Sequence, residues 1–420
     1  MGAFSIFTIK KNNKKKQPTP TVNEYYGGLA KRANRIMMLV GLLLVTFIIF
    51  SFTFYTEHLT IENLRYMLKF VEFDSTPVAS NGTEIIFDND LKSTGALIKG
   101  DIAVVDTNGL RIYDNKGQRI FRYSNYYTNP LTAYNGKNLI VCEKNTNSIK
   151  IFSSYSELHT ANFAYPVLNI CAAETGRYAV MTASKGFKSG FEVFDSNYRI
   201  IFYQYYTEKH TTSFNLSADG KNIAVCALMN SDKGEYVSTT YIYDVDDGSE
   251  QLCFTHNNEI PWNVQFTENG FVLITNKALR FYNKNGDILN EIFYGSKEPR
   301  NFEISDKYIL VSYKSSGLGN ATNVDIYTEK GSFVNTKNYQ SSLDSVHIID
   351  EYAYIYSLGT LYTINLTGQN SDKTDIIGYD FISLINDKEN EQIIMFQKGS
   401  ATIYNKTNFN SEALVQEDKK

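Results

Sequence analysis

The sequence predicts an all-β protein, an eight-bladed β-propeller that follows an N-terminal transmembrane helix. Three observations predict this fold. The chain has a single long uncharged apolar segment near its N-terminus, a short phrase that recurs through the rest of the chain, and strand-like apolar runs on both sides of each phrase. Seven blades are the alternative if the weakest phrase, around Ile364, does not form a blade of its own.

The apolar segment runs from Ile36 to Tyr55 and contains no charged residue. A helix of about 20 residues spans a hydrocarbon core of about 30 Å. A cleavable signal peptide has a shorter apolar stretch and small residues at its cleavage site, whereas this segment runs on into Phe54 and Tyr55. We therefore expect an uncleaved membrane anchor.

The charges on either side of the segment predict its orientation. Residues 1–35 hold eight cations and one anion, Glu24, which leaves 33 of the 41 cations and 44 of the 45 anions for the rest of the chain. Cationic flanks stay in the cytoplasm. We therefore expect a single-pass plasma-membrane protein with a basic cytoplasmic tail at 1–35 and an extracytoplasmic remainder. The excess of anions in that remainder disfavours nucleic acid as a partner.

Residues 56–77 are expected to form a juxtamembrane helical stalk. Leu64, Met67, Leu68 and Val71 recur at helical spacing and form one apolar stripe. A spacer packed on the domain and a surface-lying or dimerising helix are both compatible with this stripe. The propeller then extends over residues 78–410, and residues 411–420 form a polar C-terminal tail.

The recurring phrase has the form of GLRIYDNKG and occurs eight times. Its anchor residues are Tyr113, Phe152, Phe194, Tyr243, Tyr282, Tyr327, Ile364 and Tyr404. Successive anchors are 37 to 49 residues apart, close to the period of about 40 to 45 residues of a four-stranded propeller blade. Each phrase is expected to be the third strand of a blade, with two inner strands before it and an outer strand after it.

The last phrase lacks a convincing fourth strand before the polar tail. The run TEIIFD, from Thr83 to Asp88, precedes the first complete blade. We predict that this run supplies the missing strand and closes the ring.

The rhythm of DIAVVDTNGLRIYDNKGQRIF resembles WD40-like and quinoprotein-like propeller repeats. Together with the anchor and the stretch TIENLRYML, the chain resembles an uncharacterised family of single-pass bacterial membrane proteins with an extracytoplasmic propeller, over residues 31–405. This resemblance implies an architecture and no established activity. The single Trp262 departs from the repeated tryptophans of quinone-dependent dehydrogenases.

The usual signatures of enzymes and metal sites are missing from the sequence. It contains no phosphate-binding loop, no GxSxG, no HExxH, and no two histidines at ligand spacing. We therefore expect no catalytic residues, no cofactor and no metal. The acidic run from Asp244 to Gly248 is interpreted as a tight turn rather than a calcium loop.

The four cysteines form no metal-ligand pattern. Buried thiols are the default. A disulfide between Cys226 and Cys253 is left open, in case these residues lie on neighbouring strands of one blade.

Loop lengths indicate which face of the propeller binds partners. Loops between second and third strands share a face with the loops between blades, and three of them are long: Ser184 to Gly190, Met229 to Ser238, and Lys314 to Asn323. Tyrosines in loops suit a binding rim because they offer a large area at low entropic cost. The candidate partner-binding residues on this face are Tyr126, Tyr127, Tyr205, Tyr206, Lys209, His210, His256 and Arg300.

These features predict a membrane-tethered interaction module rather than an enzyme. The expected partner is another envelope protein or a cell-wall polymer, and the membrane is contacted through Ile36 to Tyr55. The alternative is a sugar-processing or redox enzyme with its site in the central channel, which would need carboxylates that converge there.

Overall fold

The computed structural model describes residues 24–54, 82–87, 93–231, 234–314, 321–368, 372–388 and 390–411. The chain divides into two units, Met1–Leu64 and Arg65–Lys420. Most of the predicted cytoplasmic tail, the whole predicted stalk and nearly all of the predicted polar tail lie outside the described residues.

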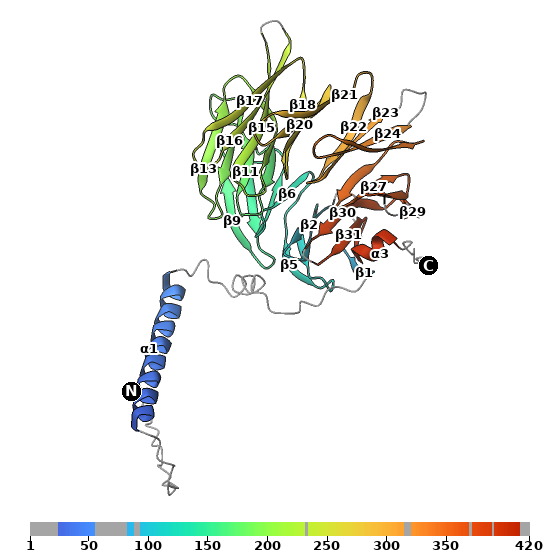
Figure 1. Ribbon diagram of the computed structural model, residues 1–420. Coiled ribbons are helices and arrows are strands. Elements are labelled where there is room, and N and C mark those ends of the chain that lie inside the picture. Colours follow the sequence, from blue (N-terminus) through green and yellow to red (C-terminus); the bar gives the residue numbers. More distant parts are fainter. Residues whose placement is uncertain are drawn as a thin grey trace. The chain divides into compact units, whose positions relative to one another are not determined.

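The first unit contains helix α1 (Glu24–Phe54), blue in Figure 1. It begins before the predicted span, so Lys31, Arg32 and Arg35 belong to it. Its side chains are described only over residues 30–46, where they are exposed. Among the residues that the structure describes, no helix is both long and apolar enough to cross a membrane.

The second unit contains eight four-stranded antiparallel sheets. In Figure 1 their colours pass in order around a ring, and the first strands meet the last. The eight-bladed propeller is therefore confirmed, and the Ile364 phrase forms a blade of its own.

Strands in the first four blades follow one another from the inside outwards. Blade one contains β2 (Thr94–Ile98), β3 (Asp101–Asp106), β4 (Gly109–Tyr113) and β5 (Arg119–Tyr123). Blade two contains β6 (Pro130–Tyr134), β7 (Leu139–Glu143), β8 (Ser148–Phe152) and β9 (Glu157–Asn162). Blade three contains β10 (Asn169–Ala172), β11 (Tyr178–Thr182), β12 (Ser189–Phe194) and β13 (Ile200–Tyr206). Blade four contains β14 (His210–Leu216), β15 (Asn222–Asn230), β16 (Tyr236–Asp244) and β17 (Glu250–Asn257).

The next three blades have the same order, and the last differs. Blade five contains β18 (Pro261–Thr267), β19 (Gly270–Thr275), β20 (Ala278–Asn283) and β21 (Ile288–Phe293). Blade six contains β22 (Glu298–Ile304), β23 (Tyr308–Lys314), β24 (Thr322–Thr328) and β25 (Phe333–Tyr339). Blade seven contains β26 (Ser345–Ile349), β27 (Tyr352–Ser357), β28 (Thr360–Asn365) and β29 (Lys373–Ile376). Blade eight contains β30 (Phe381–Asp387), β31 (Gln392–Gln397), β32 (Ser400–Asn405) and β1 (Thr83–Ile86).

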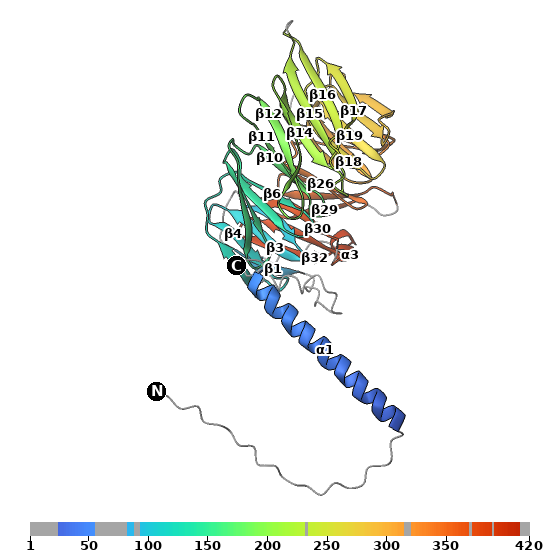
Figure 2. The same cartoon turned by 90° about the vertical axis from the view of Figure 1, so that its left-hand side faces the viewer.

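Blade eight confirms the predicted closure of the ring. β1 pairs with β32, from Thr83 opposite Ile403 to Ile86 opposite Ser400, and Figure 2 shows the two strands side by side. Ile85 is 1% exposed and Ile86 is 76% exposed. The first strand of the propeller therefore contributes to the core of its last blade.

The core lies between blades, because no blade can bury both of its faces alone. The second strands carry near-continuous apolar runs and are almost wholly buried, as in β3 (DIAVVD) and β19 (GFVLIT). The outer strands are partly exposed, as in β5 and β13.

A polar residue follows each anchor, and its side chain caps the turn that comes next. The carboxylate of Asp114 accepts hydrogen bonds from the N–H groups of Lys116 and Gln118, at 2.9 and 2.8 Å. Gly117 then adopts a φ of 80°, which glycine allows without strain. Asp244 makes the same kind of cap toward Asp246, at 2.8 Å. The run from Asp244 to Gly248 is therefore a turn, as expected.

Helix α3 (Lys406–Ser411) ends the described chain and was not expected from the sequence. Phe409 is 1% exposed, and its ring lies 5.7 Å from that of Tyr354 and 5.2 Å from that of Tyr404. The ammonium of Lys373 donates to the Phe409 carbonyl at 2.6 Å. The helix therefore covers blades seven and eight with one aromatic side chain.

Cys226 and Cys253, whose pairing the sequence left open, do not form a disulfide, because all four cysteines are free. Cys226 lies on β15 opposite Thr240, and Cys253 lies on β17 opposite Tyr241. The whole of β16 separates the two thiols, which is too far for a disulfide.

Candidate partner-binding face

Consecutive strands of a blade are antiparallel, so the loops divide between two faces. One face, which we call the loop face, carries the connections from second to third strands and those between blades. The long connections β11–β12, β15–β16 and β23–β24 lie there. The other face, which we call the turn face, carries the short turns. The chain enters the ring on the turn face, because β1 starts at that side of its blade.

Half of the predicted long loop from Met229 to Ser238 belongs to strands. β15 continues to Asn230 and β16 begins at Tyr236, and these two residues pair with each other. The segment from Met229 to Ser238 is therefore the extended end of a hairpin, because its main-chain groups continue the ladder. Figure 2 shows this hairpin projecting beyond its neighbours.

Tyr126 and Tyr127 have opposite environments. Tyr126 is 68% exposed and Tyr127 is 1% exposed. Tyr127 belongs to the core cluster that includes Leu139 and Phe152, and burial raises the pKa of its hydroxyl. The prediction of a binding role for Tyr127 is therefore wrong, because adjacent residues of an extended segment point to opposite sides.

Tyr206 and Lys209 connect blade three to blade four instead of facing a partner. The hydroxyls of Tyr206 and Tyr243 are 3.1 Å apart, and Tyr206 stacks on Tyr241 at 5.7 Å. The Lys209 ammonium lies 5.0 Å from the centre of the Tyr241 ring and donates to Thr239 at 3.1 Å. Since Tyr206 is only 9% exposed, its prediction as a binding residue is also wrong.

Three further predicted side chains, those of His210, His256 and Arg300, lie on different strands. His210 begins β14 and is exposed. His256 lies on β17, where burial lowers its pKa and its Nε2 is 3.5 Å from the Tyr282 hydroxyl. Arg300, on β22, is exposed and pairs with Glu298 at 3.4 Å. These residues are not gathered into one site.

An exposed group of aromatic side chains on blade three includes one predicted residue, Tyr205. We call Phe187, Tyr205 and Tyr203 the aromatic strip. Their ring centres are 5.6 Å apart between Phe187 and Tyr205 and 5.8 Å apart between Tyr205 and Tyr203. Phe187 is 40% and Tyr203 is 61% exposed. The Tyr205 hydroxyl donates to the Glu192 carboxylate, which holds the middle ring in place.

Sequence reasoning missed Phe187 and Tyr203. The available signal was the alternation in β13, where Tyr203 and Tyr205 share a side while Phe202 and Tyr206 pack into the core with blade four. Phe187 lies within the predicted long loop from Ser184 to Gly190, so it could have been singled out as that loop's only aromatic residue.

A buried ionic network lies next to the loop face in blade five. Arg280 donates to both oxygens of Glu259, at 2.6 and 2.8 Å, and also to Glu291. Thr275 donates to Glu259 at 2.9 Å. Burial alone would raise the pKa of Glu259, but these hydrogen bonds outweigh burial and lower it. The network is satisfied internally, so its role is to hold strands together.

Arg280 lies two residues before its anchor, Tyr282. This position of the repeat is polar in other blades too. Arg111 pairs with Asp106 inside blade one. Lys150 pairs with Glu157 at 2.9 Å, and Asp325 accepts from Lys297 at 3.0 Å. The charged side chains at this position therefore have partners in the same blade or in the connection that leads into it.

A polar hollow of about 470 Å³ opens where β2 and β6 begin. It is lined by Ser93, Thr94, Thr128, Asn129 and Pro130. Its lining offers hydrogen bonds and no titratable side chain. Among the described residues, no group of three or more His, Cys, Asp or Glu side chains could hold a metal ion.

The sequence of the propeller matches one family model. Residues 80–405 match a family of unknown function (DUF5711). The chain belongs to this family. No curated protein matches the DUF5711 chain in sequence.

Solved structures similar to the DUF5711 propeller show its fold. BamB from Moraxella catarrhalis is 10% identical with a TM-score of 0.53, covering 78% of this chain and 97% of that one. Sqt1 of Saccharomyces cerevisiae is 10% identical with a TM-score of 0.56, covering 79% and 99%. The computationally designed Ika8 protein is 12% identical with a TM-score of 0.57, covering 78% and 100%. At these identities the likeness establishes a shared propeller fold and no shared function.

Proposed function

We propose that the DUF5711 chain is a membrane-tethered, extracytoplasmic propeller that docks another envelope protein through blade three and the loop face. The observation that carries this proposal is the aromatic strip, in which two of three contacting rings are 40% and 61% exposed. Exposed aromatic side chains that contact one another are typical of protein-binding surfaces.

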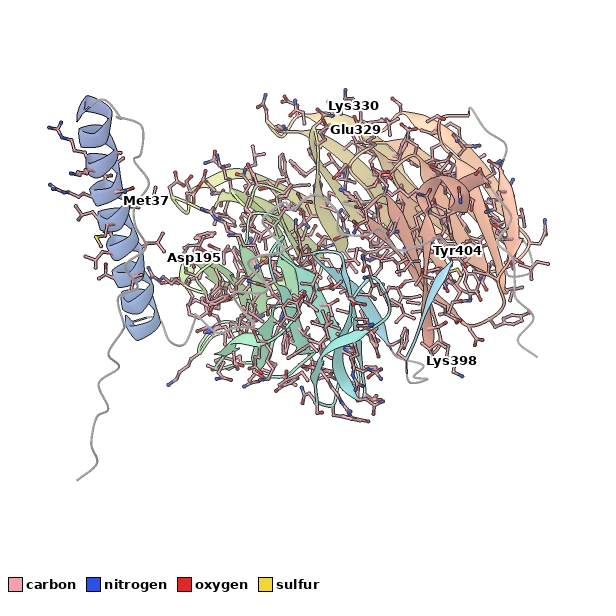
Figure 3. The ribbon with its side chains drawn as sticks, turned by 90° about the horizontal axis from the view of Figure 1, so that it is seen from below. Met37, Asp195, Glu329, Lys330, Lys398 and Tyr404 are labelled. Carbon is pink, nitrogen blue, oxygen red and sulfur yellow. The ribbon has the colours of Figure 1, made fainter. Side chains whose placement is uncertain are left out.

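The tether rests on the sequence. The uncharged segment from Ile36 to Tyr55 and the cations before it favour an anchor with a cytoplasmic N-terminus. The first described strand, β1, starts on the turn face. In Figure 3, Glu329 and Lys330 mark one turn of the turn face, at the tip between β24 and β25.

Interaction is favoured over catalysis by the innermost strands. Within the described residues, these strands carry three carboxylates, Glu298, Glu303 and Asp387. Glu298 pairs with Arg300, and Asp387 accepts from Asn390 at 2.7 Å. Two of the three carboxylates therefore have partners within the chain, which supports an interaction role over a channel enzyme. A cell-wall polymer is the competing partner, and the polar hollow would be its natural contact.

The test is crosslinking in intact cells with photoreactive residues at Phe187, at Tyr236 on the projecting hairpin, and at Lys330 on the turn face as the control. We expect one protein to be captured from Phe187 and Tyr236 and not from Lys330. Replacing Tyr203 and Tyr205 with Ser should reduce that product. Equal capture from all three positions, or none from Phe187 in well-expressed chain, would contradict the proposal.

Alkaline extraction of membranes tests the tether, since an anchored chain stays in the pellet.

A further inference from the structure

Each blade ends in an outer strand whose far edge has no hydrogen-bonded strand beside it among the residues that the structure describes. Free edges accept further strands, and proteins usually guard them with charged side chains. All eight outer strands lie within the described residues, and seven of them carry charge, for example at Glu84, Arg119, Glu157, Glu250, Glu291, Lys337 and Lys373. The exception is β13, IIFYQYY.

The unguarded edge is also apolar and exposed. Ile200 is 52%, Ile201 is 37% and Tyr203 is 61% exposed. The strand has seven residues, or about 23 Å of extended chain. It is therefore long enough to pair with another strand over several residues.

The outward main-chain groups of β13 can be identified. The N–H of Lys188 donates to the carbonyl of Tyr206 at 2.9 Å, so the main-chain groups of Tyr206 face β12. Because these groups alternate along a strand, those of Tyr203 and Tyr205 face away from the sheet. The Gln204 side chain donates to the Tyr205 carbonyl at 3.1 Å, and an incoming strand would replace this bond.

We propose that β13 is a docking edge for an extended, uncharged strand of the partner protein, which adds to the sheet of blade three. The proposal rests on the proposed function and specifies the kind of segment that binds. Main-chain hydrogen bonds supply the affinity in this mode of recognition, and pockets for alternate side chains supply the specificity. The aromatic strip lines one side of β13 and would supply these side-chain contacts. It also connects β13 to the loop face.

Because β13 carries no charged residue, the strand that pairs with it should also be uncharged. A charged side chain placed over Ile201 or Tyr203 would lose water without finding a counter-charge on β13. We therefore expect β-branched and aromatic residues alternating with small polar ones. β13 of a second copy is also uncharged, so self-pairing is the competing occupant and is measured in the same experiment.

The experiment uses the full chain in lipid nanodiscs and a synthetic peptide, Thr-Val-Thr-Phe-Thr-Val-Thr, as the probe. We expect the peptide to slow hydrogen exchange of the amides in β13 by about tenfold and to leave β21 unchanged. A peptide of the same composition with proline at its centre should have no effect. Unchanged exchange in β13 at saturating peptide would overturn the proposal.

Two variants separate strand pairing from simple ring contact. Tyr203→Pro removes an N–H that faces away from the sheet. Tyr203→Lys places a charged side chain on β13, as the other outer strands have. Both should weaken peptide binding about tenfold, whereas Tyr203→Phe and the matched control Leu289→Lys on β21 should not. If Tyr203→Pro and Tyr203→Lys both bind normally while the Phe187 crosslink survives, the docking function stands and strand addition is wrong.

Self-pairing gives a distinct result. A dimer in analytical ultracentrifugation that Tyr203→Lys dissociates would show that a second copy occupies the edge, and would overturn the partner-strand proposal. A monomer that binds the peptide supports it.

Discussion

Arg280 and Glu259 form a two-point ion pair between the β20 strand and the loop that leads into β18, with nitrogen–oxygen distances of 2.6 and 2.8 Å. The two side chains are 4% and 10% exposed. They join the third strand of blade five to the connection from blade four, so the pair stabilises the loop face at a boundary between blades.

Replacing Glu259 with Ala should lower the free energy of unfolding by about 3 kcal/mol, because it leaves the buried Arg280 without its main partner. Glu291 also contacts Arg280 but is 30% exposed, so Glu291→Ala should cost about 1 kcal/mol. Urea denaturation measures both. Equal losses in the two variants would contradict the dominant role assigned to Glu259.

The ring closure can be tested with two adjacent isoleucines. Ile85→Ala should destabilise the chain by about 2 to 4 kcal/mol, because Ile85 is 1% exposed in the core between blades eight and one. Ile86→Ala should change stability by less than about 0.5 kcal/mol, because Ile86 is 76% exposed. Thermal unfolding of the two variants compares them directly. Similar melting temperatures would argue against β1 as a core strand.

Glu303 should make stability fall as pH rises. Burial raises the pKa of this carboxyl to about 7, so the folded chain keeps a proton that the unfolded chain releases near pH 4 to 5. Unfolding then releases a proton, and stability decreases between about pH 4 and pH 7. Above pH 7, Glu303→Gln should be more stable than the natural chain by about 2 to 3 kcal/mol.

Denaturation curves recorded from pH 5 to pH 8 would show the effect. The control is Glu298→Gln on the same strand, where the carboxylate is exposed. An unchanged pH profile in Glu303→Gln would rule out the raised pKa.

Substitutions of Tyr126 and Tyr127 should have different effects, the first on binding and the second on stability. Tyr127→Ala should cost about 3 to 5 kcal/mol, since it removes a large buried side chain. Tyr126→Ala should leave stability within about 0.5 kcal/mol and act only on contacts made at the exposed surface. Circular dichroism during heating, together with the crosslinking yield at Phe187, measures both properties. A large loss of stability in Tyr126→Ala would contradict this division.

Much of the architecture could be predicted from local patterns. The anchors from Tyr113 to Tyr404 recur because every blade needs the same third strand and the same capped turn, so eight phrases indicated eight blades. The pairing of Thr83–Ile86 with the last blade was predictable because one strand was missing there and one was spare at the other end. Helix α3 was missed because a helix of six residues carries almost no periodic signal.

The sequence by itself therefore indicated eight blades, with seven as the alternative, and it predicted the closure of the ring and the turns, since each depends on residues adjacent in the chain or on a repeat. Only the tertiary structure decided which tyrosines are free. Tyr206 meets Tyr243 across a boundary between blades, whereas Tyr203 remains exposed on the same strand. The physical reason is that burial depends on what the neighbouring blade brings to each side of a strand, and residues far apart in the sequence supply it.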